Sequence, residues 1–385
     1  MFNFICLNLR IMFKRLILLL SVFLVPCATL LCESIKGGDG RLTYIGRTEV
    51  HDGEVSFDWT GVYVKIRFQG NSLTLKASDT GKNYYNVWLD GAMDSAPDKV
   101  IKVTGKDTTI TLFSATELKA RFGKDKKASK APHQVIIQKR TEGSQGRTTI
   151  KEFTTDGVFL QADTPSERVI EFVGDSYTCG YGTEASNKEH FSPETENQNL
   201  TYACATARYF GAEQMVIAHS GIGVVRNYNG KLNEGNMPAR YQNVFDSEDA
   251  PKWNPGESVL RPAITVIYLG TNDFSTRMQP AERIFSKGYI TLLKEIKEFY
   301  GTEHPILCVA PKHDILQLEY INNAARASGL QNIHVMGLGS SVHNETSDMG
   351  ADGHPNYNGH IKIAHSVIPY ISTIMGWEMT SGTIR

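Results

Sequence analysis

Four short motifs in the sequence carry residues that could support nucleophilic acyl transfer, and the first of them holds a serine. FVGDSYTCGYG, at residues 172–182, ends an apolar run at Gly174 and opens a turn with Ser176. A serine at a helix N-terminus lies among free backbone N–H groups, where developing negative charge is stabilised. Serine is also a favoured N-cap, so this motif alone does not separate a nucleophile from a cap. Thr178 stands where the GxSxG elbow has its second glycine, which disfavours an α/β-hydrolase.

The best candidate for a general base is His354, in the motif GADGHPNYNGH at residues 350–360. Asp352 precedes it by two residues in a turn-rich loop. That spacing would let the carboxylate reach the imidazole and fix its tautomer, which is the contact between acid and base in a catalytic triad. Of the eleven histidines, His354 has the best-placed acid. His360 is expected to lie on the last helix as a surface or packing residue.

The two remaining motifs offer hydrogen-bond donors. AHSGIGVVRNY, at residues 218–228, contains glycines that let a backbone N–H approach a ligand closely. YLGTNDF, at residues 268–274, contains Asn272, whose side-chain amide could point at an oxyanion. Taken alone, the GTND segment could equally be a helix cap, with Asp273 as the capping residue.

All four motifs follow or adjoin predicted elements of a parallel sheet. Continuous apolar runs indicate strands buried on both faces, at residues 169–173, 215–218, 263–269, 305–310 and 332–337. Helix-like segments lie between and after them, at residues 281–300, 314–327 and 357–374. This alternation predicts an α/β fold whose parallel sheet is covered by helices on both faces. Reactive groups in such sheets gather beyond the carboxyl ends of the strands, which is where the motifs fall.

The first part of the chain predicts a separate, all-β domain. Alternating segments at residues 62–68, 72–77, 84–91, 108–113 and 133–140 are separated by turn signals. Short alternating strands at regular spacing predict an antiparallel β-sandwich. The basic stretch at residues 119–130 is expected to be a solvated loop. We therefore place a β-sandwich of jelly-roll type at residues 36–162 and a catalytic α/β domain at residues 165–385.

Residues 1–32 predict an export signal. Lys14 and Arg15 precede the apolar run LILLLSVFLV, which is too short and interrupted for a comfortable membrane span. The mature chain is therefore expected to be periplasmic, at the cell surface or extracellular, with no membrane span. A lipid anchor on Cys27 or Cys32 is the alternative, although the residues before these cysteines fit that signal poorly.

The composition excludes several classes of function. The chain has 385 residues, of which 41% are hydrophobic and 21% charged, which is typical of a folded globular protein. Its net charge of −1 gives no indication of a nucleic-acid partner. After residue 32 only Cys179, Cys204 and Cys308 remain, and their spacing forms neither a disulfide framework nor a CxxC metal site. We expect no metal and no cofactor.

The blocks GDS, SG, GTND and DGHP, in this order, resemble the conserved blocks of the SGNH (GDSL-like) hydrolases over residues 168–375. The resemblance implies a flavodoxin-like catalytic domain in which Ser176 is the nucleophile and its N–H the first oxyanion donor. Gly221 is implied as the second donor, with Gly223 as the fallback, and Asn272 as the third. His354 is implied as the base and Asp352 as its supporting acid.

More narrowly, the chain resembles carbohydrate esterase family 2. This resemblance rests on the DxH spacing, the preceding β-sandwich and the segments GDSYTCGYG, HSGIGVVRNY, DGHPN and KRTEG. That resemblance implies removal of acetyl groups from plant polysaccharides such as xylan and glucomannan, including 6-O-acetyl hexose units. Some members lack the acid and use a Ser–His pair. The alternatives are an SGNH esterase or lipase acting on another acyl ester, and an inactive carbohydrate-binding protein.

Overall fold

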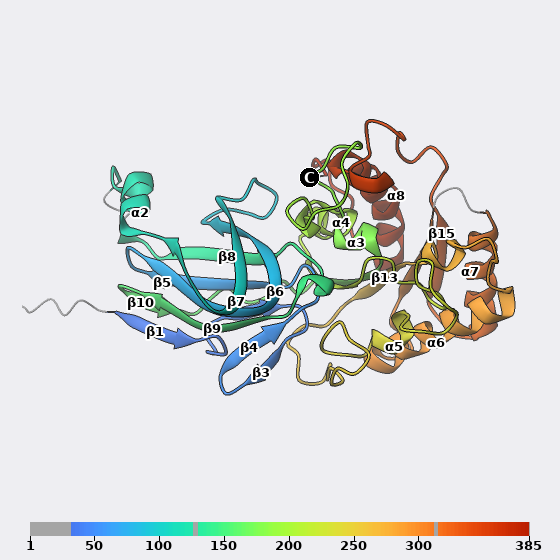
Figure 1. The fold of residues 1–385 in the computed structure, drawn as a ribbon, viewed down its shortest axis with the longest axis horizontal. Coiled ribbons are helices and arrows are strands. Elements are labelled where there is room, and N and C mark those ends of the chain that lie inside the picture. The colour runs from blue at the N-terminus through green and yellow to red at the C-terminus, as the bar shows by residue number, and fades with distance from the viewer. Residues whose placement is uncertain (1–31, 126–129, 312–314, 385) are drawn as a thin grey trace, which may run out of the picture.

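The computed structural model describes residues 32–125, 130–311 and 315–384 and shows two domains side by side, an all-β domain and an α/β domain (Figure 1). The predicted fold class is confirmed. The expected export signal lies outside the described residues, apart from Cys32 at its end. Across the described ranges, no helix combines the length and apolar character needed to span a bilayer.

The first domain is a ten-stranded antiparallel sheet within the described residues. Its strands are β1 (Glu33–Lys36), β2 (Thr43–Ile45), β3 (Glu49–His51), β4 (Glu54–Phe57), β5 (Tyr63–Gln69), β6 (Leu73–Leu89), β7 (Lys99–Phe113), β8 (His133–Lys139), β9 (Thr148–Thr155) and β10 (Val158–Leu160). The first half of β6 pairs with β9 and the second half with β8, so the sheet divides into two layers. Buried side chains of both layers meet in one apolar core.

The 17-residue strand β6 differs from the sequence-based expectation, which had two strands at residues 72–77 and 84–91. The polar stretch between them has the composition of a turn. In the structure it is an irregular section of one strand, with register shifts against β7 around Asp79. Such irregularities bend a strand without ending it, and this one lets β6 belong to both layers.

A short helix, α2 (Ala115–Phe122), occupies the beginning of the basic stretch that was expected to be a loop at residues 119–130. Its N-terminus is a capping box. The N–H of Glu117 donates to the Ser114 hydroxyl at 3.3 Å, and the N–H of Ser114 donates to the Glu117 carboxylate at 2.8 Å. The S-x-x-E signature of this box is visible in the sequence, and the expectation of a loop for this part was wrong.

The second domain is built on a five-stranded parallel sheet in the order β12–β11–β13–β14–β15. These strands are β11 (Val169–Gly174), β12 (Glu213–Ala218), β13 (Ile264–Tyr268), β14 (Ile306–Ala310) and β15 (Ile333–Gly337). This is the flavodoxin-like order, in which ligands bind beyond the carboxyl ends of the two strands where the winding reverses. Here those strands are β11 and β13. The strand β15 is only partly buried because it lies at the sheet edge, which corrects the expectation of burial on both faces.

Helices cover both faces of this sheet. They are α3 (Ser176–Cys179), α4 (Tyr202–Tyr209), α5 (Met237–Arg240), α6 (Glu282–Tyr300), α7 (Ile315–Ser328) and α8 (Tyr357–Met375), with 3₁₀ turns at Gly143–Gln145, Gln198–Leu200, Asn272–Phe274 and Ala351–Gly353. Side chains of α4 and α8 share one core with Phe172 of β11, and side chains of α6 and α7 share the other core with its neighbour Val173. Successive residues of a buried strand thus face opposite helical layers.

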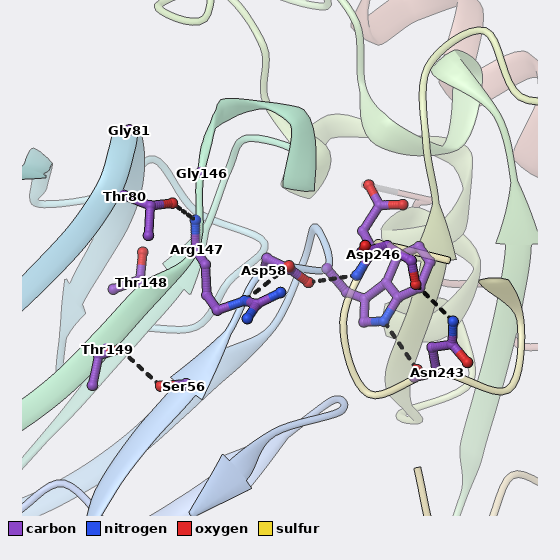
Figure 2. Close-up of polar contacts among 12 residues, drawn as sticks. Ser56, Asp58, Thr80, Gly81, Gly146, Arg147, Thr148, Thr149, Asn243 and Asp246 are labelled. Atoms are coloured by element: carbon purple, nitrogen blue, oxygen red, sulfur yellow. Dashed lines mark hydrogen bonds and ion pairs between the residues drawn. The ribbon is translucent and has the colours of Figure 1, made fainter. Parts of the chain in front are cut away.

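Buried polar contacts join the two domains. Arg47, from the β domain, is fully buried, and its guanidinium lies 3.2 Å from the Glu171 carboxylate on β11. Figure 2 shows a second contact, in which Asp58 accepts the backbone N–H of Asp246 at 2.8 Å and pairs with Arg147 at 3.3 Å. Buried charges that cross a domain boundary are costly to separate, so these contacts fix how the domains sit together.

Candidate active site

Ser176 lies where β11 ends, at the first residue of the short helix α3. Its neighbour Asp175 caps this helix by accepting the N–H of Tyr177 at 3.2 Å. The serine is therefore not the cap, and its own N–H, at the first helical position, has no acceptor within the helix. Ser176 is only 8% exposed, so a charge that forms beside it is poorly screened by water.

His354 contacts the serine directly. Its Nε2 lies 2.8 Å from the Ser176 Oγ, although the two residues are 178 positions apart in the chain. The loop that carries His354 leads into α8 at the carboxyl edge of the sheet. Burial lowers the pKa of His354, so the imidazole is neutral at neutral pH and can accept the hydroxyl proton.

The carboxylate of Asp352 does not hold the imidazole, which corrects the expected triad. Nδ1 of His354 instead lies 3.2 Å from the carbonyl oxygen of Ala351. Ala351–Gly353 form a 3₁₀ turn that ends at His354. In such a turn the residue at i+3 lies above the residue at i, so the carbonyl of Ala351 lies beneath the His354 ring. Asp352, with φ +48°, turns away and accepts hydrogen bonds from His190 at 2.7 Å, Phe191 N–H at 2.9 Å and the Tyr181 hydroxyl at 3.1 Å.

Aromatic rings fix the orientation of the imidazole. The Tyr181 ring stacks on His354 with centroids 4.1 Å apart, and Phe191 stacks on the other side of Tyr181 at 4.2 Å. Tyr177 meets the imidazole edge-on at 5.5 Å. The carboxylate of Asp352 thus bonds the ring that stacks on the base, and its charge raises the pKa of His354 against the larger effect of burial. The GYG of the first motif was the sequence signal for Tyr181, while nothing in the sequence singled out Phe191.

The two glycines proposed as the second oxyanion donor differ in their hydrogen bonds. The N–H of Gly223 donates to the Asn227 side chain at 3.1 Å, and a Cβ at this position would lie 1.9 Å from the Arg226 carbonyl oxygen. Gly223 is thus needed for a tight turn. Gly221 has φ +79°, and its N–H has no acceptor among the residues that the structure describes. The geometry favours Gly221 over Gly223, and its role as donor remains a prediction.

Asn272 lies at the end of β13, beside the nucleophile, but its amide nitrogen already has two acceptors. These are the carbonyl oxygen of Ile222 at 2.9 Å and the carboxylate of Asp175 at 3.2 Å. Burial raises the pKa of Asp175 to about 7. An oxyanion would have to replace one of these acceptors, so the role of Asn272 as third donor also remains a prediction.

Asp273 organises the loop that carries the glycines. It is fully buried, and its carboxylate accepts the backbone N–H groups of Val224, Val225 and Arg226 at distances of 2.7–3.1 Å. Sequence reasoning considered it only as a helix cap. Its actual partners lie nearly fifty residues earlier, a separation at which no local pattern identifies them.

One group of three potential metal ligands lies next to this site in the described part of the chain: Glu142, Cys179 and Glu196. Burial raises the pKa of the Cys179 thiol well above its usual range. Within the group the Cys179 thiol donates to the Glu142 carboxylate at 3.5 Å, and the Glu142 N–H donates to Glu196 at 3.3 Å.

Tyr228 provides an exposed aromatic face beside the site. Its ring is 64% exposed, and its N–H donates to the carbonyl oxygen of Gly221 at 2.7 Å. An exposed aromatic ring beside Gly221 is a suitable surface for a flat, partly apolar group.

Comparisons with known proteins divide the chain as the fold does. The family model for the carbohydrate esterase 2 N-terminal domain matches residues 44–163, and that for the GDSL-like lipase/acylhydrolase family matches residues 172–361. The first match ends in the segment between β10 and β11, and the second begins within β11.

Two curated proteins and one solved structure are similar over most of the chain. The cellulase/esterase CelE of Acetivibrio thermocellus is 30% identical over 329 residues, which are 83% of this chain but only 38% of that protein. An acetylxylan esterase/glucomannan deacetylase of Cellvibrio japonicus is 26% identical over 383 residues, covering 96% of this chain and all of that protein. A family two carbohydrate esterase from Clostridium thermocellum, solved with cellohexaose, superimposes with a TM-score of 0.76 at 28% identity, covering 88% of this chain and 100% of that one.

Proposed function

This chain belongs to carbohydrate esterase family 2, and from that premise we propose that it is a serine esterase that removes O-acetyl groups from plant-type polysaccharides and oligosaccharides. The observation that carries the proposal is the 2.8 Å contact between the Ser176 hydroxyl and Nε2 of His354. The names of the relatives support acetylated xylan and glucomannan as substrates. The exposed Tyr228, whose N–H bonds the Gly221 carbonyl, offers an aromatic face that would suit a sugar substrate.

Acylation begins when Nε2 of His354 takes the Ser176 proton as the hydroxyl oxygen attacks the acetyl carbonyl carbon. The C=O π electrons move to the carbonyl oxygen, which becomes the oxyanion. We propose that the N–H groups of Ser176 and Gly221 stabilise it. The Ala351 carbonyl accepts Nδ1–H throughout, so the imidazolium that forms keeps its orientation.

The acetyl-enzyme forms when the tetrahedral intermediate collapses and the C–O bond to the sugar breaks. The imidazolium of His354 protonates the leaving sugar alkoxide. Water then attacks the carbonyl carbon of the acetyl-enzyme while His354 accepts a proton from it. The second tetrahedral intermediate collapses, acetate leaves, and His354 returns the proton to the Ser176 oxygen. The protein contributes two side chains, Ser176 and His354, together with backbone groups, and water is the second nucleophile.

Substitution of the nucleophile tests the proposal. We expect Ser176→Ala to lower the rate of acetyl release from acetylated xylan and from 4-nitrophenyl acetate by about 10⁶-fold, because the covalent step is lost. Ser366→Ala is the matched control, since Ser366 lies on α8 and bonds only the Lys362 carbonyl. Undiminished turnover by Ser176→Ala would refute the assignment.

The two alternatives are separated by substrate and by labelling. A panel of acetylated oligosaccharides and long-chain esters distinguishes a deacetylase from a lipase, and we expect short acetyl esters to be preferred. An inactive carbohydrate-binding protein would leave Ser176 unlabelled by an organophosphate, whereas an esterase would be labelled at that residue alone.

We also propose that the protein is exported, on the basis of the basic and apolar pattern at residues 1–32. Fractionation of cells expressing the full chain is the test, with N-terminal sequencing of the product. The expected result is activity outside the cytoplasm and a shortened N-terminus. A product that retains residues 1–32 in the cytoplasm would contradict it.

A further inference from the structure

One carboxylate oxygen of the β domain contacts two catalytic segments of the α/β domain. Glu142 follows β8 and is only 3% exposed. Its Oε2 accepts the backbone N–H of Ser220 at 2.6 Å and the thiol of Cys179 at 3.5 Å. Ser220 directly precedes Gly221, while Cys179 ends the helix that begins with Ser176.

The surroundings hold Glu142 firmly in place. Its N–H donates to Oε2 of Glu196 at 3.3 Å, and its carbonyl oxygen accepts from Nζ of the fully buried Lys139 at 2.9 Å. Burial, with Glu142 nearby, raises the pKa of Glu196 well above its usual range. Glu142 is thus fixed at its backbone on both sides, and its carboxylate can act as a rigid acceptor.

The same loop has a second attachment to the β domain. His219, next to Ser220, pairs with the buried Asp246 at 2.7 Å, and the N–H of Asp246 bonds Asp58 as Figure 2 shows. The loop that carries Gly221 is therefore fastened at two successive residues by groups that lead to the other domain.

From these contacts we infer that Glu142 is a positioning residue that sets the spacing between the two backbone donors of the oxyanion hole, Ser176 and Gly221. The inference rests on the proposed esterase activity. Both donors are N–H groups of separate segments, α3 and the loop after β12, and Glu142 Oε2 is bonded to both segments at once. Without this shared acceptor, the hydrogen bonds that hold α3 and the loop after β12 at a fixed distance from each other are lost.

The effect should appear in turnover rather than in substrate binding, because the oxyanion exists only after attack on the carbonyl. Misplacing a catalytic group by about 1 Å can cost about 10²-fold in rate. We therefore expect Glu142→Ala to lower kcat by about 10²-fold while KM stays nearly unchanged.

The experiment uses the full-length protein with four variants, and each is checked for folding by its melting temperature. In Glu142→Gln the amide oxygen can still accept both hydrogen bonds, so most of kcat should return. In Glu142→Asp the oxygen is withdrawn by one methylene, so kcat should lie between those of the Ala and Gln variants. Glu213→Gln is the matched control, because Glu213 is also a buried glutamate between the two domains but lies at the opposite end of β12 from Ser220, where it bonds Lys65 and the N–H of Ser166, and its kcat should equal that of the wild type.

A folded Glu142→Ala or Glu142→Asp variant with wild-type kcat would overturn the inference, and so would a Gln variant as slow as the Ala variant. If Glu142→Ala does not fold, the Asp variant decides. The rate at which a phosphonate labels Ser176 is measured in parallel, since the charged phosphoryl oxygen occupies the same hole. If the wild type hydrolyses no acetyl ester, the proposed function fails, yet the labelling rates still test the role of Glu142.

Discussion

The imidazole of His354 is oriented by a backbone carbonyl, since its Nδ1 lies 3.2 Å from the oxygen of Ala351. A carbonyl fixes the tautomer and the ring plane as a carboxylate does. It carries no full negative charge, however, so it stabilises the imidazolium less. The site is therefore a Ser–His pair with a neutral orienting group.

We expect Asp352→Ala to be tolerated far better than His354→Ala. Loss of the orienting carboxylate of a triad costs about 10⁴ in kcat. Here the carboxylate touches Tyr181 and His190 instead of the base, so the loss should be about tenfold or less. Steady-state kinetics on 4-nitrophenyl acetate measure this, with His365→Ala on the exposed face of α8 as the control for histidine loss. Equal losses in the Asp352 and His354 variants would contradict the observed contacts.

The acid limb of the pH–rate profile should lie below the usual histidine range. Catalysis requires neutral His354, and burial lowers its pKa below the ordinary value of 6.5. Activity that depends on the neutral form is thus retained as pH falls through 6.5 and is lost only below it. The measurement is kcat/KM of the free enzyme from pH 4 to 9. Asp175→Asn is measured in parallel, because burial raises the pKa of Asp175 to about 7 and its titration must be told apart from that of the imidazole. An inflection above 6.5 that persists in this variant would refute the prediction.

Asn272→Ala should reduce kcat by about 10²–10³-fold with a smaller change in KM, if the amide turns from Asp175 to the oxyanion during reaction. Kinetics at saturating and limiting substrate separate the two parameters. A loss confined to KM would mean that Asn272 serves substrate binding. A lowered melting temperature with normal kcat would mean that it only joins Ile222 to Asp175.

Tyr228→Ala should raise KM for acetylated oligosaccharides and leave KM for 4-nitrophenyl acetate nearly unchanged. The exposed ring adjoins Gly221 and can contact a sugar that extends beyond the acetyl group, whereas the small ester does not need it. Tyr370→Ala is the matched control, since this 45% exposed tyrosine lies far along α8 from the site. A rise in KM for both substrates would place the ring at the acetyl group itself.

Much of the α/β domain could be predicted because four of its five strands, β11 to β14, are buried on both sides. Continuous apolar runs identified each strand, and the helix expected at residues 281–300 is found as α6, beginning at Glu282. Since parallel strands end at one edge, the sequence also predicted that Ser176 and His354 would lie close together, as they do.

The remaining features depended on geometry that local sequence does not encode. Asp352 is two residues from His354, but the 3₁₀ turn and a positive φ direct its carboxylate to the segment at residues 190–191. Glu142 belongs to the β domain, and its contact with Ser220 spans 78 positions. Such contacts arise from how the two domains pack, which neither periodicity nor motif spacing reports.

The buried pair of Arg47 and Glu171 has a consequence for biosynthesis. Arg47 leaves the ribosome 124 residues ahead of Glu171, and its side chain also packs against the rings of Tyr241 and Trp253, which are made later still. In a nascent β domain this guanidinium faces water, because the carboxylate and the rings that bury it belong to the second domain. Opening the interface of the finished protein would break this buried pair, which is strongly destabilising, so the two halves should denature together in a single calorimetric transition.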